Sequence, residues 1–292
     1  MRHIAILTMI SILIGLISGC ATVSNKDMFR VRTAEELIDA IGPDRTIILD
    51  PKEFVISGLS QSSRSHVIWQ NVHDGDQIVV QNLRNLRICT EGDKPASILV
   101  APRYAYALSF KNCKDVSLVN VAFGHTKEKG YCTGGVLSFT RCENVVIQNT
   151  TLHGSGHEGL TVADSTNLSF VGSTIRDCTY GIMSLSDSSN IHFQKARFID
   201  NQTFDLISIQ HCEDVIFEQC EILHNQAGWD GEETECSLFN ISSSSGITVR
   251  DSLIQNNSLD YLLNREGTMS FTGSDIRQNT LRVSRYKYYK QE

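Results

Sequence analysis

A recurring block of residues constrains this chain more than any other feature of its sequence. An apolar residue follows an Asn or Asp at six places, and two weaker copies come later. These anchor residues are Leu86, Val116, Val145, Leu168, Ile191, Val215, Ile247 and Met269. Subtraction of their numbers gives spacings of 30, 29, 23, 23, 24, 32 and 22 residues. Such spacing indicates stacked repeats with occasional insertions.

Three columns of apolar residues support the repeat. Two residues after the anchors come Ile88, Leu118, Ile147, Phe170, Phe193, Phe217, Val249 and Phe271. Six residues before them come Val80, Phe110, Phe139, Val162, Leu185, Ile209, Ile241 and Leu263. Seven residues after, from the second anchor on, come Phe123, Leu152, Ile175, Phe198, Ile222, Ile254 and Ile276. Apolar residues two apart define the buried face of a strand, so each block predicts three short strands.

The residue just before each of the first six anchors is an Asn or an Asp. This column consists of Asn85, Asp115, Asn144, Asn167, Asn190 and Asp214. Both residue types tolerate the left-handed αL conformation, so the column predicts a stacked turn. Three strands per coil predict an all-β fold: a single-stranded right-handed parallel β-helix of about eight or more coils. Each coil would pair with the coils above and below it.

The open ends of such a β-helix need caps, because they expose unpaired strand edges. The segment "TAEELIDAI" (33–41) predicts an N-terminal α-helical cap, in which Thr33 and Glu36 form a capping box. Its apolar residues Leu37, Ile38 and Ile41 share one helical face. We expect the β-helix with its cap to span residues 33–280. The basic aromatic tail, 281–292, is expected to cap the last coil; alternatively, its cations contact anionic lipid or glycan.

The first residues carry the features of an export signal. A basic start leads into an apolar run, Ile4 to Ile17, which is too short to span a bilayer. The sequence "ISGC" that ends at Cys20 resembles the lipobox of bacterial lipoproteins. The resemblance implies a signal peptide at 1–19, lipidation of Cys20, and a tether at 20–32. The next two residues, Ala21 and Thr22, favour the outer membrane in a Gram-negative host. A plain secretory signal is the alternative.

The charge of the chain limits its partners. The formal net charge is -7. An acidic protein gains nothing from the phosphate attraction that drives nucleic-acid binding, so we expect no nucleic-acid partner. A polyanionic sugar would also be repelled unless a cation or a basic patch intervened.

The cysteines predict small buried side chains. Columns of small residues contain Cys113, Cys142, Cys212 and Cys220. Thiols at such positions pack as small apolar groups. Export permits disulfides. Cys113 and Cys142 fall on neighbouring coils, so a disulfide between them is the alternative to two free thiols. Cys132 and Cys178 lie in the loop register.

The segment "HGSGHEG" (153–159) lies between the third strand of one coil and the first strand of the next. Counting back from the following anchors stacks it on three other loops. The columns are Cys132, Ser155, Cys178 and Gln202; Gly134, His157, Tyr180 and Phe204; and Gly135, Glu158, Gly181 and Asp205. Glu158 and Asp205 are then two coils apart, about 9.6 Å between backbones. Inverting glycosidases hold two carboxylates roughly 6.5–9.5 Å apart.

These loops therefore contain the candidate catalytic residues. They are Glu158, Asp205, His157, His153, Tyr180 and His125. In an enzyme, Glu158 would be the acid, and Asp205 or a histidine the base. Tyr180 and His157 would position the sugar. The alternative is a set of solvated turns whose glycines only permit tight bends.

The insertion at 224–236 starts from the same edge. Trp229 is a possible sugar-stacking platform there. The acidic residues Asp230, Glu232, Glu233 and Glu235 are possible Ca²⁺ ligands. Oxygen-rich acidic sets of this kind suit calcium. An exposed acidic loop without a ligand is the alternative.

The coils, the cap and phrases such as "NVVIQN" (144–149) and "YGIMSLSDSSNIHF" (180–193) resemble the pectate-lyase-like right-handed parallel β-helix superfamily. The resemblance covers about residues 30–280. It implies carbohydrate substrates and sites along one face of the rod. The lyases of that superfamily use calcium held by acidic residues, with a Lys or Arg base. This sequence matches neither that arrangement nor the paired aspartates of polygalacturonases, so no catalytic residue transfers from it.

Two functions from different classes follow from this reading. The first is an exported cell-envelope lipoprotein that binds, and in one version cleaves, a polysaccharide across the loop face at 125–205. The second is a non-catalytic adhesin or structural β-helix. An enzyme needs convergent polar groups with shifted pKa values, whereas a scaffold needs only a continuous surface.

Overall fold

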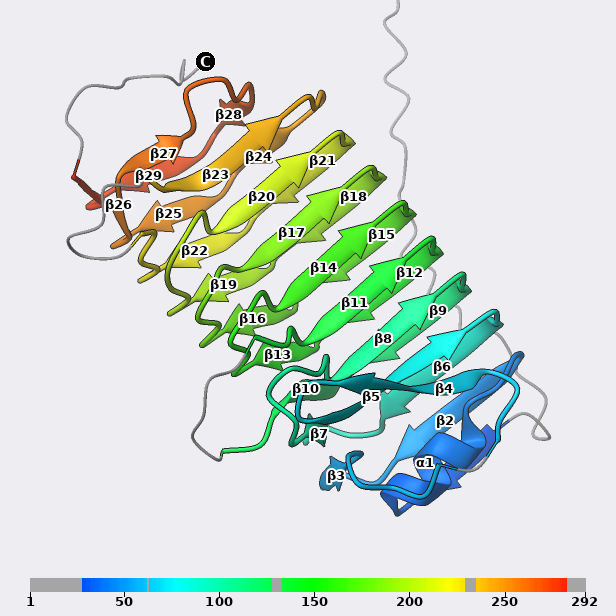
Figure 1. Ribbon diagram of the computed structural model, residues 1–292. Coiled ribbons are helices and arrows are strands. Elements are labelled where there is room, and N and C mark those ends of the chain that lie inside the picture. The colour runs from blue at the N-terminus through cyan, green and yellow to red at the C-terminus, as the bar shows by residue number, and fades with distance from the viewer. Residues whose placement is uncertain (1–27, 62, 128–132, 229–234, 283–292) are drawn as a thin grey trace, which may run out of the picture.

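The computed structural model describes residues 28–61, 63–127, 133–228 and 235–282. Within these residues it contains one short helix, α1 (Ala34–Ala40), and strands β1 to β30. The strands wind into coils that stack as a rod, with α1 at the blue end and β28 and β29 at the orange-red end (Figure 1). The predicted signal peptide, Cys20 and most of the tail lie outside the described residues.

Three long sheets run along the rod. In spatial order, sheet A contains β1 (Met28–Val31), β2 (Arg45–Leu49), β6 (Arg84–Thr90), β9 (Lys114–Val119), β12 (Glu143–Gln148), β15 (Thr166–Val171), β18 (Ser189–Gln194), β21 (Glu213–Glu218), β24 (Thr248–Arg250) and β28 (Ser270–Thr272). Sheet B contains β3 (Glu53–Val55), β7 (Ala96–Val100), β10 (Val121–His125), β13 (Thr151–His153), β16 (Thr174–Arg176), β19 (Arg197–Ile199), β22 (Glu221–Leu223), β25 (Leu253–Gln255) and β29 (Asp275–Arg277). Sheet C contains β4 (Val67–Val72), β5 (Gly75–Gln81), β8 (Leu108–Lys111), β11 (Leu137–Thr140), β14 (Leu160–Ala163), β17 (Met183–Ser186), β20 (Ile207–Gln210), β23 (Ser237–Ser242) and β27 (Tyr261–Leu263). A small fourth sheet pairs β26 (Ser258–Leu259) with β30 (Thr280–Leu281).

The strand registers confirm the repeat. Leu168 pairs with Val145 and Ile191 in sheet A, and Ile175 pairs with Leu152 and Phe198 in sheet B. Except for β4, which lies antiparallel on β5, the paired strands run parallel. The predicted β-helix with three strands per coil is therefore confirmed. Since β1 begins at Met28, regular structure starts inside the segment expected to be a tether.

The Asn and Asp column adopts the expected backbone. Asn85, Asp115, Asn144, Asn167, Asn190 and Asp214 all have φ between 55° and 60°. Their side chains also bond along the rod: the Asn190 Nδ2 donates to Asn167 Oδ1 at 3.1 Å, and the Asn167 Nδ2 donates to Asn144 Oδ1 at 3.0 Å. The turn thus satisfies its own polar groups while it repeats.

A second asparagine ladder lies inside the rod, and the sequence reasoning missed it. Its members are Asn201, Asn225, Asn257 and Asn279. Asn225 is 1% exposed; its backbone N–H and its Nδ2 donate to Asn257 Oδ1 and to Phe198 O, each at 2.9 Å. Its Oδ1 accepts the backbone N–H of Asn201 at 3.0 Å. The amides replace backbone pairing where the third strand turns, so this bend is stiff.

The core between the sheets is continuous and aromatic. Phe193 and Phe217 stack at 4.7 Å between ring centroids, and Phe110 and Phe139 stack at 5.0 Å. Each of these rings is at most 1% exposed. Burial of one such side chain stabilises the fold by about 2–3 kcal/mol, so successive coils are held together mainly by these columns.

The helical cap forms as predicted, with a capping box between Thr33 and Glu36. Leu37 and Ile38 are buried, and Ile41 is the C-cap residue. At seven residues, α1 is shorter than the predicted 33–41 segment. In the part of the chain that the structure describes, no helix has the length and apolar character needed to cross a membrane.

The last coil departs from the predicted register. The predicted column places Leu263 opposite Ile241. In the structure Leu263 pairs with Phe239 instead. Since Phe271 still pairs with Val249, the turn between those strands is two residues shorter in the last coil than in the preceding one. Asn264 takes over the missing pairing: its Nδ2 donates to Ile241 O at 3.0 Å and its Oδ1 accepts Ile241 N–H at 2.9 Å.

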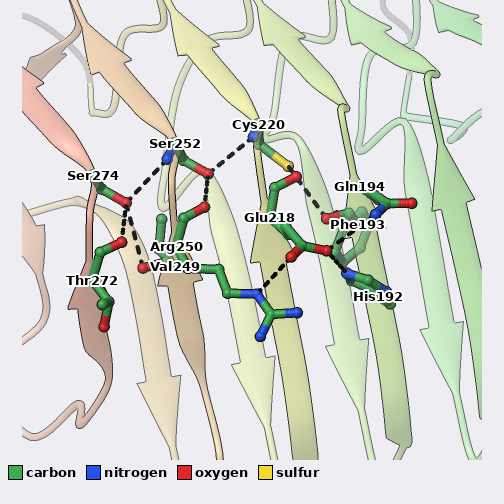
Figure 2. A network of polar contacts seen from close by, with 10 residues as sticks. All are labelled: His192, Phe193, Gln194, Glu218, Cys220, Val249, Arg250, Ser252, Thr272 and Ser274. Atoms are coloured by element: carbon green, nitrogen blue, oxygen red, sulfur yellow. Dashed lines mark hydrogen bonds and ion pairs between the residues drawn. The ribbon is translucent and has the colours of Figure 1, made fainter. Parts of the chain in front are cut away.

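The described cysteines are all buried and free of disulfides. This leaves the possible pair Cys113 and Cys142 as two thiols, each donating to a backbone carbonyl. Cys220 shares a column with Ser252 and Ser274 (Figure 2). The Ser252 hydroxyl accepts the backbone N–H of Cys220 at 2.9 Å, and the Ser274 hydroxyl accepts that of Ser252 at 3.2 Å. The small-residue prediction is therefore confirmed for these positions.

Cys178 corrects the sequence alignment of the loops. Although it lies in the loop between β16 and β17, it is 1% exposed and belongs to the hydrophobic core. Its backbone N–H donates to Asn201 Oδ1, which makes Asn201 its partner in the next coil, not Gln202. The extra residue of that coil falls after this point, at Thr203 and Phe204, both of which have positive φ. Cys132 lies outside the described residues.

Candidate functional site

The loops between sheets B and C form one edge of the rod, hereafter the loop edge. It comprises residues 153–159, 176–182 and 199–206. In the other two columns the backbone links the first two members, since His157 N–H donates to Gly134 O at 3.3 Å and Val136 N–H donates to Glu158 O at 3.1 Å. In the coil with the extra residue the bonding shifts, and Gly181 N–H donates to Gln202 O at 3.0 Å.

Three aromatic rings lie in line on this edge, hereafter the aromatic ledge: His157, Tyr180 and Phe204. The His157 and Tyr180 rings meet edge-on with centroids 6.1 Å apart, and the Tyr180 and Phe204 rings are 5.3 Å apart. Phe204 is 50% exposed and has φ of 49°, a conformation that bulky residues rarely adopt. Strain of this kind persists where the surrounding structure holds it, and it concentrates at functional sites.

His157 and Glu158 form an imidazole–carboxylate pair. The His157 Nδ1 contacts Glu158 Oε2 closely. The hydrogen bond that His157 donates to Glu158 raises the pKa of His157, against the opposing effect of partial burial. The His157 side chain is 44% exposed and that of Glu158 is 17% exposed. Because Nδ1 faces the carboxylate, Nε2 is the nitrogen that can exchange a proton with a ligand.

Tyr106 is a site residue that sequence reasoning missed. Its ring lies across Gly135, where a Cβ would clash with it. Its hydroxyl reaches Thr161 Oγ1 at 3.1 Å, two coils along the rod. Burial raises the pKa of the Tyr106 phenol, and the charge of Glu158 adds to this effect. The sequence shows Gly135, but it does not show that the Tyr106 ring packs on this glycine and leaves no room for a Cβ.

Asp205 occupies the predicted column, but its carboxylate is committed to the next coil. Its Oδ1 accepts the backbone N–H of Ser237 at 2.6 Å and the Ser237 hydroxyl at 2.7 Å. Its Oδ2 accepts Asn240 Nδ2 at 2.6 Å. With three donors bound, Asp205 positions β23 and is poorly placed to take a proton opposite Glu158.

His125 and His153 lie deeper than the ledge. His125 is 4% exposed, its Nε2 donates to Ala105 O at 2.9 Å, and burial lowers its pKa to about 4. Burial also lowers the pKa of His153, and the Arg176 charge adds to this. The His153 ring packs directly on Gly124. Both imidazoles are therefore neutral at physiological pH and support the wall between coils.

The described residues contain no group of three or more His, Cys, Asp or Glu side chains placed to hold a metal ion. Glu235, one of the possible calcium ligands, pairs with Arg265 at 2.9 Å. Trp229, Asp230, Glu232 and Glu233 lie outside the described residues. Calcium binding by that loop stays a prediction.

A polar cluster on the outer face of sheet A has a structural role. Glu218 accepts His192 Nε2 and Gln194 Nε2, each at 3.1 Å, and pairs with Arg250 Nε at 2.9 Å (Figure 2). Partial burial would raise the pKa of Glu218, but the Arg250 contact outweighs it and the pKa is lowered. Both carboxylate oxygens contact side chains of neighbouring strands, so this cluster joins three coils.

Comparison with known proteins assigns the family. Residues 106–281 match the model of the right handed beta helix region, which is more than half of the chain, so the chain belongs to this family. The match confirms the predicted right-handed fold. A search of curated proteins finds no significant match.

Solved structures show the same fold at low identity. A pectate lyase from Paenibacillus sp. 0602 is similar at 11% identity and a TM-score of 0.57, over 92% of this chain and 80% of that one. The pectin methylesterase from Aspergillus niger is similar at 9% identity and a TM-score of 0.51, over 90% of this chain and 89% of that one. A further pectate lyase, at 11% identity and a TM-score of 0.53, covers 89% and 84%. At these identities the likeness establishes the architecture alone.

Proposed function

We propose that this protein binds a polysaccharide along the aromatic ledge at the loop edge. The observation that carries the proposal is Phe204, a half-exposed ring held in left-handed backbone in line with Tyr180 and His157. Sugar rings present apolar faces that stack on aromatic side chains. A strained backbone and an exposed apolar ring are both unfavourable on a free surface, and a ligand that covers Phe204 would offset this cost. The pectate lyases and pectin methylesterase among the structural neighbours lend support to carbohydrate as the ligand class.

The His157–Glu158 pair is the proposed proton-transfer group of the same site. Glu158 orients the imidazole and favours its protonated form. His157 can then give a proton to a glycosidic or ester oxygen, or accept one from a hydroxyl or water, through Nε2. Asp205 is left out of this chemistry because its carboxylate already binds three donors.

The test is a polysaccharide panel applied to residues 21–292. Binding is measured by affinity electrophoresis, and cleavage by release of reducing or unsaturated ends. We expect Phe204→Ala to weaken binding about tenfold or more, since stacking of a nucleic-acid base on an aromatic ring is worth about 1–3 kcal/mol and a sugar face stacked on Phe204 should contribute comparably. Val146→Ala, an exposed apolar residue on sheet A, is the control and should bind normally.

The outcomes separate the functional classes. Cleavage that is lost in Glu158→Gln, with binding retained, assigns an enzyme. Binding without cleavage assigns a lectin-like rod. A folded protein that binds no polysaccharide would contradict the proposal and favour the adhesin or structural role.

A further inference from the structure

A cavity lies at the opposite edge of sheet C from the aromatic ledge. Its volume is about 520 Å³, within the range of ligand pockets. The polar lining includes His211, Glu213, Ser243, Ser245, Glu266 and Thr268. Ile241 forms part of its wall. The cavity lies beside the shortened turn of the last coil, where Leu263 pairs with Phe239 and Asn264 bonds to the backbone of Ile241.

The outer face of sheet C joins this cavity to the ledge. Strand β20 leaves the loop edge after Phe204 and ends next to His211, and its four residues span roughly 13 Å. The outward side chains of β17, β20 and β23 are small or medium-sized and uncharged. They are Ser184, Ser186, Ser208, Gln210, Asn240 and Ser242. This surface offers hydroxyl and amide groups to a ligand that crosses it.

Charge is confined to the two ends of this path and is mainly negative. Glu158 and Asp205 lie on the loop edge, where Asp205 accepts a hydrogen bond from Asn240, and Glu213 and Glu266 line the cavity. Carboxylates accept hydrogen bonds from sugar hydroxyls, but they repel the carboxylates of a uronic acid polymer. The path therefore suits a chain of uncharged sugars.

We propose that the cavity is a second subsite, that the glycan crosses sheet C from the aromatic ledge to the cavity, and that its sugars are uncharged. The inference rests on the proposed function and deepens it. It differs from a ligand lying along the rod axis, which would contact the ledge of several coils but not the cavity. The proposed uncharged glycan also differs from pectate, the polyuronate after which pectate lyases are named.

The test compares hexasaccharides and disaccharides of uncharged glucose, mannose and xylose with oligogalacturonate, by calorimetry at fixed ionic strength. An uncharged hexasaccharide should bind more tightly than its disaccharide and than oligogalacturonate. Thr268→Trp fills the cavity and should weaken hexasaccharide binding about tenfold, with little effect on the disaccharide. Thr272→Trp is the matched control, since Thr272 is also an exposed threonine of the last coil and lies in β28 of sheet A, away from the cavity.

Each other outcome overturns a different statement. Tighter binding of oligogalacturonate overturns the inference on charge while it supports the proposed function. An uncharged hexasaccharide that is bound equally well by Thr268→Trp and Thr272→Trp overturns the second subsite. If no probe binds to the folded protein, the proposed function fails and this inference fails with it.

Discussion

At the scale of single residues, the direction of a side chain decides its chemistry more than its position in a column. Glu158 and Asp205 occupy the same column of the loop edge. Glu158 turns to its neighbour His157, whereas Asp205 is bound by Ser237 and Asn240 of the next coil. A pair that looked equivalent in the alignment therefore divides into a candidate functional group and a structural one.

The His157–Glu158 pair makes a prediction about pH. The raised pKa of His157 means that the proton stabilises the folded state. This stabilisation is fully present below the ordinary histidine pKa of about 6.5, and it is lost as the pH rises through the higher folded value. We expect Glu158→Gln to bring the pKa of His157 down toward its ordinary value, as measured by NMR titration of the imidazole protons. His153, whose pKa is lowered by burial and by the Arg176 charge, serves as the internal reference and should keep its lowered pKa.

An unchanged pKa of His157 in Glu158→Gln would contradict the pairing. The experiment requires no ligand, so it tests the geometry of the site independently of its function. A shift of both histidines would instead report a general change of the fold at the loop edge.

At the scale of the element, the rod carries two asparagine systems with different roles. The column at Asn144, Asn167 and Asn190 lies in exposed turns and supplies left-handed backbone. The ladder at Asn201 and Asn225 is buried and replaces backbone pairing at the bend below the loop edge. The exposed column was predicted from its position beside the anchors. The buried ladder lies three residues after the third-strand column, and it was missed because earlier coils have Ser155 and Cys178 at that position.

Removal of one buried amide should cost far more than removal of an exposed one. Asn225→Ala leaves the backbone N–H and the Nδ2 of Asn201 without their acceptor, and we expect a loss of about 3 kcal/mol in the free energy of unfolding. Asn190→Gly keeps the left-handed backbone and removes an exposed side chain, so its loss should stay below about 1 kcal/mol. Urea unfolding of the two variants measures the difference, and equal losses would refute the distinction.

The registers show how far alignment by counting can go. The anchors and the sheet B column paired as predicted because every coil buries the same alternating face. The count failed at Gln202 and Leu263, where coils gain or lose residues in a turn. A turn absorbs such changes by its backbone conformation, as at Thr203 and Phe204, and no periodic pattern marks where this happens.

At the scale of the whole molecule, the rod is a stack in which each coil contacts only its neighbours. Such a stack offers three long faces, one for each long sheet, and two ends. The cap α1 and the antiparallel strand β4 lie at the N-terminal end, and Asn264 closes the last coil against β23. The loop edge and the outer face of sheet C are left as the continuous surface on which we place the glycan.

We propose, from the lipobox-like "ISGC", that the rod is exported and held at the cell envelope by a lipid on Cys20. The full chain, expressed in a Gram-negative host, should incorporate labelled palmitate and sediment with the outer membrane. Cys20→Ala should lose the label, because it lacks the lipidated cysteine. It should also lose the membrane association, because the apolar segment 4–17 is too short to span the bilayer. Equal membrane association of the two proteins would contradict the anchor.

The sequence by itself determined the coil: the period, the three buried columns and the left-handed Asn turns follow from local alternation and residue type, which repeat in every coil. Only the tertiary structure decided the site. Tyr106 reaches Thr161 across Gly135, and Asp205 turns to Ser237, through contacts between residues 29 or more positions apart. Such contacts depend on which neighbouring coil offers a partner and on how each turn bends. That information lies in the packing of the coils and is not contained in the pattern of any one of them.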